Sequence, residues 1–210
     1  LIIVQQLWQN EQKQFESSNQ NLEMLNMYCH DLKHLLTMMK EKNSTDEFIG
    51  EVTNALSVFD AMKTTGNHAL DVILTEKSLF CKQKNIKLTC MADGKQLDFI
   101  QTTDLYSVFG NLLNNAIEAT LQVQNPDKRI IALIINRSNG FVRIHIENFF
   151  NGKISYVNGF PQTNKNQPAY HGYGLKSIKY MLERYHGNIS FEDQNDIFCV
   201  NIIIPIPEEI

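Results

Sequence analysis

One stretch of the chain repeats apolar and polar side chains with the period of an α-helix. Its apolar members recur three and four residues apart and build one face: Val108, Leu112, Leu113, Ala116, Ile117 and Ala119. Asn111, Asn115 and Glu118 repeat at the same spacing and fall on a different stripe. An asparagine amide competes with the helix backbone for hydrogen bonds, so two asparagines one turn apart in a helix call for a reason.

This polar row has two interpretations. A carboxamide oxygen can coordinate a hard cation such as Mg²⁺, which takes oxygen ligands and often arrives with phosphates and water already attached. The row can equally be a solvated helix face that happens to carry asparagine. The row alone leaves both interpretations open.

A glycine pair, Gly172 and Gly174, stands directly before a second helical pattern. The apolar members of that pattern are Leu175, Ile178, Met181, Leu182 and Tyr185. A helix N-terminus offers free N–H groups and a positive dipole end to a phosphate. A lone Gly-x-Gly is a weak signal, because most are ordinary turns. Because it follows the asparagine row, the two motifs together are a far more specific signal than either motif alone.

The order of asparagine helix, hairpin, loop and Gly-x-Gly-Leu helix resembles the GHKL ATP-binding domain shared by histidine kinases, Hsp90-type chaperones, DNA gyrase and MutL. The resemblance covers roughly residues 84–210. It implies a Bergerat-type α/β sandwich, with ATP and Mg²⁺ as cofactors and Asn115 as the metal ligand. The nucleotide-binding residues that it implies are Asn111, Asn115, Glu118, Asn148, Gly172, Gly174 and Leu175.

Residues 147–152 depart from the family pattern. Many kinases of this superfamily carry Asp-x-Gly-x-Gly here, and the Asp reads the adenine amino group. This chain reads Glu-Asn-Phe-Phe-Asn-Gly, so Asn148 stands at the Asp position. Its amide oxygen still accepts a hydrogen bond but carries no charge, so we expect weaker nucleotide binding. A plain strand-end residue is the other interpretation. Residues 151–170 are predicted as a mobile lid over the phosphates.

Two apolar seams occupy the first part of the chain. The first contains Leu22, Leu25, Cys29, Leu32, Leu36 and Met39. The second contains Val52, Ala55, Phe59, Met62, Gly66, Ala69, Ile73 and Phe80. They predict two helices, at about 10–41 and 46–83, that form a hairpin too thin to bury both stripes alone. A homodimer in which two hairpins form a four-helix bundle would bury both stripes, and we expect this arrangement.

The first seam carries the sequence His-Asp-x-x-His at residues 30–34. This helix ahead of a GHKL domain resembles a sensor histidine kinase, specifically the Agr-like quorum-sensing branch, which residues 65–74 also resemble. The resemblance implies that His30 is autophosphorylated and that Asp31 holds the other ring N–H. His34 either assists phosphatase chemistry or decorates the helix face. The phosphoryl group then passes to an aspartate of a response regulator.

A GHKL pseudokinase or scaffold that binds a partner without histidine phosphorylation is the rival function, and the neutral Asn148 keeps it open. The formal net charge of −4 and the lack of a basic cluster argue against nucleic acid as a partner. The four cysteines show no ligand spacing, so we expect reduced cysteines and no zinc site.

The predicted architecture is α+β, with a helical hairpin at 1–83 and an ATP-binding domain at 84–210. Strands are expected at 86–90, 129–136, 141–148, 188–192 and 197–205, with a helix at 175–186. Helices on one face of a mixed sheet form the α/β sandwich. No run approaches the ~20 apolar residues that cross a bilayer. The resemblance places a membrane sensor upstream and this region in the cytoplasm.

Overall fold

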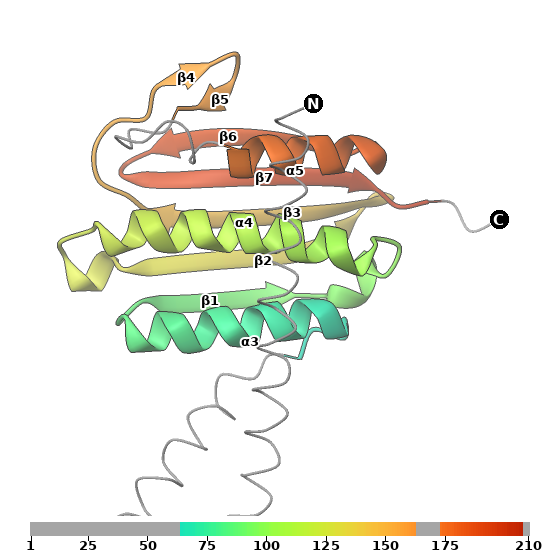
Figure 1. Cartoon of the computed structure of the whole chain (residues 1–210), viewed down its shortest axis with the longest axis horizontal. Coiled ribbons are helices and arrows are strands. Elements are labelled where there is room, and N and C mark those ends of the chain that lie inside the picture. The colour runs from blue at the N-terminus through green and yellow to red at the C-terminus, as the bar shows by residue number, and fades with distance from the viewer. Residues whose placement is uncertain (1–63, 163–172, 208–210) are drawn as a thin grey trace, which may run out of the picture.

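The computed structural model describes residues 64–162 and 173–207, which form a five-stranded sheet with three α-helices on one face (Figure 1). The helices are α3 (His68–Gln83), α4 (Thr102–Leu121) and α5 (Tyr173–Arg184). The strands of the large sheet are β1 (Lys87–Ala92), β2 (Ile130–Ser138), β3 (Phe141–Phe149), β6 (Asn188–Gln194) and β7 (Ile197–Pro205). Residues 1–63 of the predicted helical hairpin, which include His30 and Asp31, lie outside the described residues.

The large sheet is mixed, as the sequence predicts. Its strand order is β1-β2-β3-β7-β6, with β1 parallel to β2 and every other pair antiparallel. Asn139 (φ 51°) and Gly140 (φ 80°) turn β2 into β3, and Asn195 (φ 54°) and Asp196 (φ 63°) turn β6 into β7. Left-handed backbone at both central residues suits the twist of a two-residue hairpin. The predicted strands are confirmed, with ends that differ by up to two residues.

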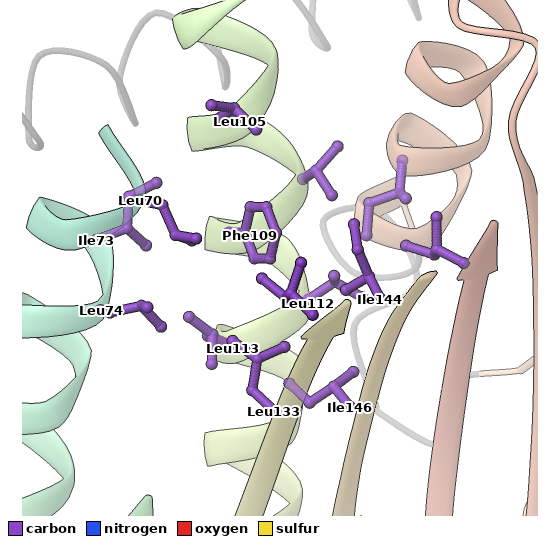
Figure 2. Close-up of a cluster of buried hydrophobic side chains, with 14 of the residues drawn as sticks. Leu70, Ile73, Leu74, Leu105, Phe109, Leu112, Leu113, Leu133, Ile144 and Ile146 are labelled. Carbon is purple, nitrogen blue, oxygen red and sulfur yellow. The ribbon is translucent and has the colours of Figure 1, made fainter. Parts of the chain in front are cut away.

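The core lies between the helices and the sheet (Figure 2). Alternate residues of β2 and β3 are buried on the helix side: Ile131, Leu133, Ile135, Val142, Ile144 and Ile146. Of the predicted apolar face of α4, all but Ala119 are at most 5% exposed. Short 3₁₀ turns at Gly94–Leu97 and Pro126–Lys128 join the elements. In the described part of the chain, no helix has the length and apolarity that spanning a bilayer demands.

The predicted continuous helix over 46–83 is wrong at residues 64–67, which are not helical. Gly66 has φ 92°, and the Asn67 side chain accepts from the N–H of Leu70 at 3.0 Å, so a new helix starts at His68. The Asp71 carboxylate also accepts from the N–H and the hydroxyl of Thr65, both at 2.6 Å. These contacts break the seam that sequence spacing alone extends through Gly66.

Helix α3 packs against the core of the α/β unit. Leu70, Ile73 and Leu74 point toward α4 and are at most 2% exposed (Figure 2). The packing therefore assigns α3 to the α/β unit, whereas the sequence pattern assigns residues up to 83 to the hairpin. The reason is that the same apolar stripe suits either neighbour, and a spacing pattern does not name the neighbour.

The predicted lid begins with ordered structure. Strands β4 (Tyr156–Val157) and β5 (Phe160–Pro161) pair around an Asn158-Gly159 turn beside β6 (Figure 1). The Tyr156 hydroxyl donates to Asp193 at 2.5 Å, and burial together with this hydrogen bond raises the pKa of Tyr156. The Phe160 ring centroid lies 5.2 Å from that of Phe191. The first half of the predicted lid thus contains a short hairpin at 156–161, and the lid role stays a prediction.

Candidate functional site

Asn111 is half-buried in the middle of α4, with a fixed amide orientation. Its Nδ2 donates to the backbone carbonyl oxygen of Ser107, one turn earlier, at 2.8 Å. A carbonyl accepts only from the NH₂ side of the amide, so this bond also fixes which way Oδ1 faces. From the residues that the structure describes, Oδ1 accepts no hydrogen bond. It is an acceptor open to a ligand.

The first turn of α5 lies directly against this amide. A Cβ placed on Gly174 would lie 2.9 Å from Oδ1 of Asn111 and 3.4 Å from its Cγ. Only glycine allows a helix backbone to approach that closely without displacing the amide. The structure thus brings together Asn111 and Gly174, which are far apart in the sequence, and their ligand roles stay predictions.

A polar clamp at the other end of α5 sets the direction of the helix. The Arg184 guanidinium and the Tyr185 hydroxyl both donate to the Asp104 carboxylate, the latter at 2.5 Å. Tyr185 also accepts from the N–H of Gln101 at 3.1 Å, and burial with the Asp104 hydrogen bond raises its pKa. Asp104 is only 5% exposed, whereas the Arg184 side chain is 49% exposed, so the clamp is buried on its carboxylate side only. Sequence reasoning misses it, since an Asp in a first helical turn is an ordinary dipole partner.

The clamp and the close contact together show that α5 runs antiparallel to α4, from Asn111 toward Asp104. The free N–H groups of a helix's first turn point out along its axis. Those of α5 therefore point toward the part of α4 that carries Asn115 and Glu118, both exposed. Two carboxamide oxygens and a carboxylate beside an N-terminus form a donor set that suits Mg²⁺ with phosphate.

Asn148 lies on the helix side of β3, at its C-terminal end, and is 4% exposed. Its Nδ2 donates to the Phe149 carbonyl at 2.9 Å. Within 64–162 and 173–207, its Oδ1 accepts no hydrogen bond, so a second amide oxygen remains open to a ligand. Leu175 packs against the core as a half-buried side chain. Gly172 lies outside the described residues.

Residues 100–205 match the model of a family described as the GHKL domain, which is just over half of the chain. The matched range contains both open amide oxygens, the clamp and α5. This chain belongs to the GHKL domain family. GHKL membership agrees with the α/β sandwich and the mixed sheet described above.

Individual relatives of this GHKL chain are distant. A probable C4-dicarboxylate sensor kinase of Halalkalibacterium halodurans is 25% identical over 145 residues, which cover 65% of this chain and 26% of that protein. The chain thus spans about a quarter of the length of this curated relative.

The chain is also similar to solved structures. The catalytic domain of histidine kinase ThkA is 22% identical, with a TM-score of 0.50 over 68% of this chain and 93% of that domain. The histidine kinase domain of a blue-light activated kinase from Erythrobacter litoralis is 14% identical, with a TM-score of 0.45 over 93% of this chain and 94% of its own. The ThkA likeness supports the GHKL sandwich as the shared fold.

Proposed function

We propose that this chain is the catalytic part of a two-component sensor histidine kinase that binds ATP with Mg²⁺ and transfers the γ-phosphate to His30. The observation that carries the proposal is the contact of Gly174 with Asn111, in which a glycine-led helix N-terminus lies against an amide with an open oxygen. GHKL domains bind ATP, usually with Mg²⁺, and the matched range includes both residues.

The described residues have separate roles in this proposal. The first turn of α5 binds the phosphates through its N–H groups, and Asn148 accepts from the adenine amino group. Asn115 holds Mg²⁺, with Asn111 and Glu118 beside it. When bound, Mg²⁺ supplies positive charge that neutralises the phosphates. The protein's contribution is then mostly positioning, which the Asp104 clamp supports by holding α5 against α4.

The phosphoacceptor half of the proposal rests on sequence and relatives. His30 and Asp31 lie outside the described residues, and their pattern resembles that of kinase hairpins. The similarity to a sensor kinase favours this reading. We further propose a homodimer through the hairpin, a response regulator as the phosphate acceptor and the Agr-like branch as the subgroup.

Labelled ATP tests the proposal directly. The chain is incubated with γ-labelled ATP and Mg²⁺, and acid-labile, base-stable phosphate is followed on the protein. We expect label on the parent and none on His30→Gln. His186→Asn is the matched control, because His186 is exposed, lies outside the site and has φ 54°, a backbone that asparagine accepts well. Label that persists in His30→Gln would assign the acceptor elsewhere.

A pseudokinase or scaffold is the second candidate, favoured by the neutral Asn148 where many kinases carry an acid. It predicts ATP binding without any protein label. Thermal unfolding with and without ATP separates this outcome from a domain that binds no nucleotide, because a bound ligand raises the unfolding temperature.

A further inference from the structure

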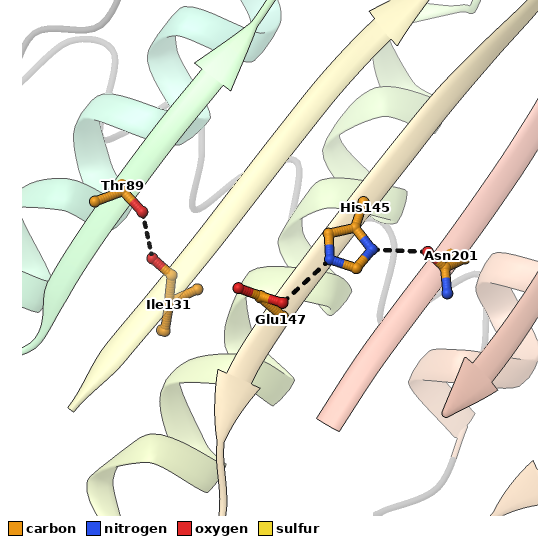
Figure 3. Close-up of polar contacts among 5 residues, drawn as sticks. All are labelled: Thr89, Ile131, His145, Glu147 and Asn201. Carbon is orange, nitrogen blue, oxygen red and sulfur yellow. Dashed lines mark hydrogen bonds and ion pairs between the residues drawn. The ribbon is translucent and has the colours of Figure 1, made fainter. Parts of the chain in front are cut away.

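The face of the sheet turned away from the helices carries a polar cluster on its central strands. His145 and Glu147 alternate along β3 with the buried core residues, and Cys199 and Asn201 share the same face on β7. The register pairs Glu147 with Cys199 and His145 with Asn201. Figure 3 shows His145 between Glu147 and Asn201, with the helices behind the strands. No part of the nucleotide proposal uses this face.

Three of these side chains offer ligand atoms at metal-site spacing. A ring nitrogen of His145, a carboxylate oxygen of Glu147 and the sulfur of Cys199 all lie within 4.8 Å of one another. Nε2 of His145 lies 3.3 Å from Oε2 of Glu147. Bond lengths at tetrahedral Zn²⁺ place nitrogen and oxygen ligands about 3.3 Å apart, and nitrogen and sulfur ligands about 3.6 Å apart. The His145 nitrogen and the Glu147 oxygen are already at this spacing. The Cys199 sulfur needs to move toward them by no more than about 1.2 Å.

The hydrogen bonding of the ring favours a cation between His145 and Glu147. Nδ1 of His145 lies 2.7 Å from the amide oxygen of Asn201, so Nδ1 carries the hydrogen. In the neutral ring, the lone pair of Nε2 then faces the Glu147 carboxylate, and two acceptors face each other. Their 3.3 Å separation is longer than the roughly 2.7–2.9 Å of a charge-assisted hydrogen bond. A hydrogen-bonded second nitrogen is also the usual arrangement of a metal-binding histidine.

Access and charge agree with a site for a cation. The side chains of His145 and Glu147 are 31% and 43% exposed, so an ion can enter from solvent. Glu192 of β6 pairs with Cys199 in the sheet and adds a second carboxylate on the other side of the sulfur. The surroundings of Cys199 are therefore negative on both neighbouring strands.

We propose that His145, Glu147 and Cys199 bind one Zn²⁺ ion and so connect β3 to β7 on the open face of the sheet. Nitrogen, oxygen and sulfur donors together suit this borderline-soft ion, and three protein ligands leave a fourth position for water. Asn201 is a positioning residue that orients the ring. The inference goes beyond the proposed kinase function and does not depend on it.

The test measures metal binding without nucleotide. The 210-residue chain is stripped with a chelator, and its Zn²⁺ affinity is measured by competition with a chromophoric chelator. We expect His145→Gln and Cys199→Ser each to weaken binding at least tenfold, and Asn201→Ala to weaken it roughly 10–100-fold as an outer-shell change. Co²⁺ replaces Zn²⁺ in a second measurement, where a thiolate-to-metal absorption band is expected in the parent and absent in Cys199→Ser.

Matched controls separate this site from other histidines and cysteines of the chain. His186→Asn changes an exposed histidine at the end of α5, and Cys90→Ser changes a half-buried cysteine on the helix side of β1. Both are expected to keep the parent affinity. Thermal unfolding without metal checks that each variant folds. If Cys199→Ser does not fold, Glu147→Gln replaces it as the variant that removes a metal ligand. Unchanged affinity in the folded site variants, or a thiolate band that is lost in Cys90→Ser, would overturn the proposal.

Discussion

Replacing Gly174 by alanine is the sharpest perturbation of the nucleotide site. The added Cβ would lie 2.9 Å from Oδ1 of Asn111, closer than real Cβ atoms pack. Either the amide rotates away or the first turn of α5 moves outward by a few tenths of an ångström. Each response disturbs one of the two groups proposed to hold the phosphates and the metal.

The effect of this substitution on stability is small because two terms oppose each other. Displacing the amide weakens its 2.8 Å bond to the Ser107 carbonyl, and losing such a bond costs about 0.5–1.5 kcal/mol. Alanine in place of glycine stabilises a helix interior by about 0.5–1 kcal/mol, which is an upper value for Gly174, the second residue of α5. We therefore expect the free energy of unfolding of Gly174→Ala to change by less than about 1 kcal/mol. A stable variant makes its loss of ligand binding interpretable.

Thermal unfolding with ATP and Mg²⁺ measures that loss. At a ligand concentration of about 100 times its Kd, the parent gains about 2.7 kcal/mol, or an unfolding temperature higher by about 5–10 °C. A tenfold weaker Kd in Gly174→Ala leaves about 1.4 kcal/mol, or about 3–6 °C. Glu183→Ala is the control, because it changes an exposed residue of the same helix far from Asn111 and should keep the full shift.

Two results would refute this reasoning. If ATP raised the unfolding temperature of Gly174→Ala as much as that of the parent, the close approach of Gly174 to Asn111 would have no part in ATP binding. A drop of many degrees without nucleotide would make Gly174 a folding position and nothing more. The double variant with Asn111→Ala checks the steric cause. Without Oδ1, the Gly174→Ala change should lose its unfavourable contact and keep only its helix-stabilising term, which gives a measurable coupling energy.

Three further predictions concern Cys81, Asp104 and Asn148. Burial raises the pKa of the Cys81 thiol from 9.0 to about 11, so its stabilising contribution is complete below pH 9 and is lost as the pH rises through 11. Urea unfolding from pH 9 to pH 11 should show that the free energy of unfolding of the parent falls by on the order of 2–3 kcal/mol more than that of Cys81→Ala. Equal losses in the two proteins would contradict a raised pKa of Cys81. Asp104→Asn should lower the free energy of unfolding by about 1–3 kcal/mol, since it weakens the hydrogen bonds of a buried carboxylate to Arg184 and Tyr185, and an unchanged urea midpoint would contradict this. Asn148→Asp should tighten ATP binding about fivefold, because a charge-assisted bond to the adenine amino group replaces a neutral one. Calorimetry that finds no gain would remove Asn148 from the adenine site.

Local signals in the sequence predict the sheet and the asparagine helix well. The Asn139-Gly140 turn needs left-handed backbone at both positions, and asparagine and glycine both accept it. These two adjacent residues are therefore enough to predict where the β2–β3 hairpin turns. The apolar spacing of α4 likewise predicts which side of the helix is buried. Both features depend on residues close together in the chain.

The errors come from signals that compete over the same residues. An apolar stripe continues across Gly66, yet the Asn67 cap starts a new helix there, and a capping signal outweighs spacing where the backbone changes direction. Residues 151–170 have a polar composition, which predicts a loop, yet Asn158-Gly159 is the same turn signal that places the β2–β3 hairpin. Composition describes the segment as a whole, whereas the turn acts on four residues.

Strand β3 contributes adjacent residues to both candidate sites. Glu147 and Asn148 are adjacent, but successive strand residues point to opposite faces, so one faces the cysteine of β7 and the other faces the helices. A register shift of one residue would exchange the two faces and remove both arrangements together. The Asn139-Gly140 turn, at the far end of β3 from both sites, pairs Ser138 with Phe141 and so sets the β2–β3 register. The side of the sheet that Glu147 and Asn148 each face therefore depends on turn residues that contact neither site.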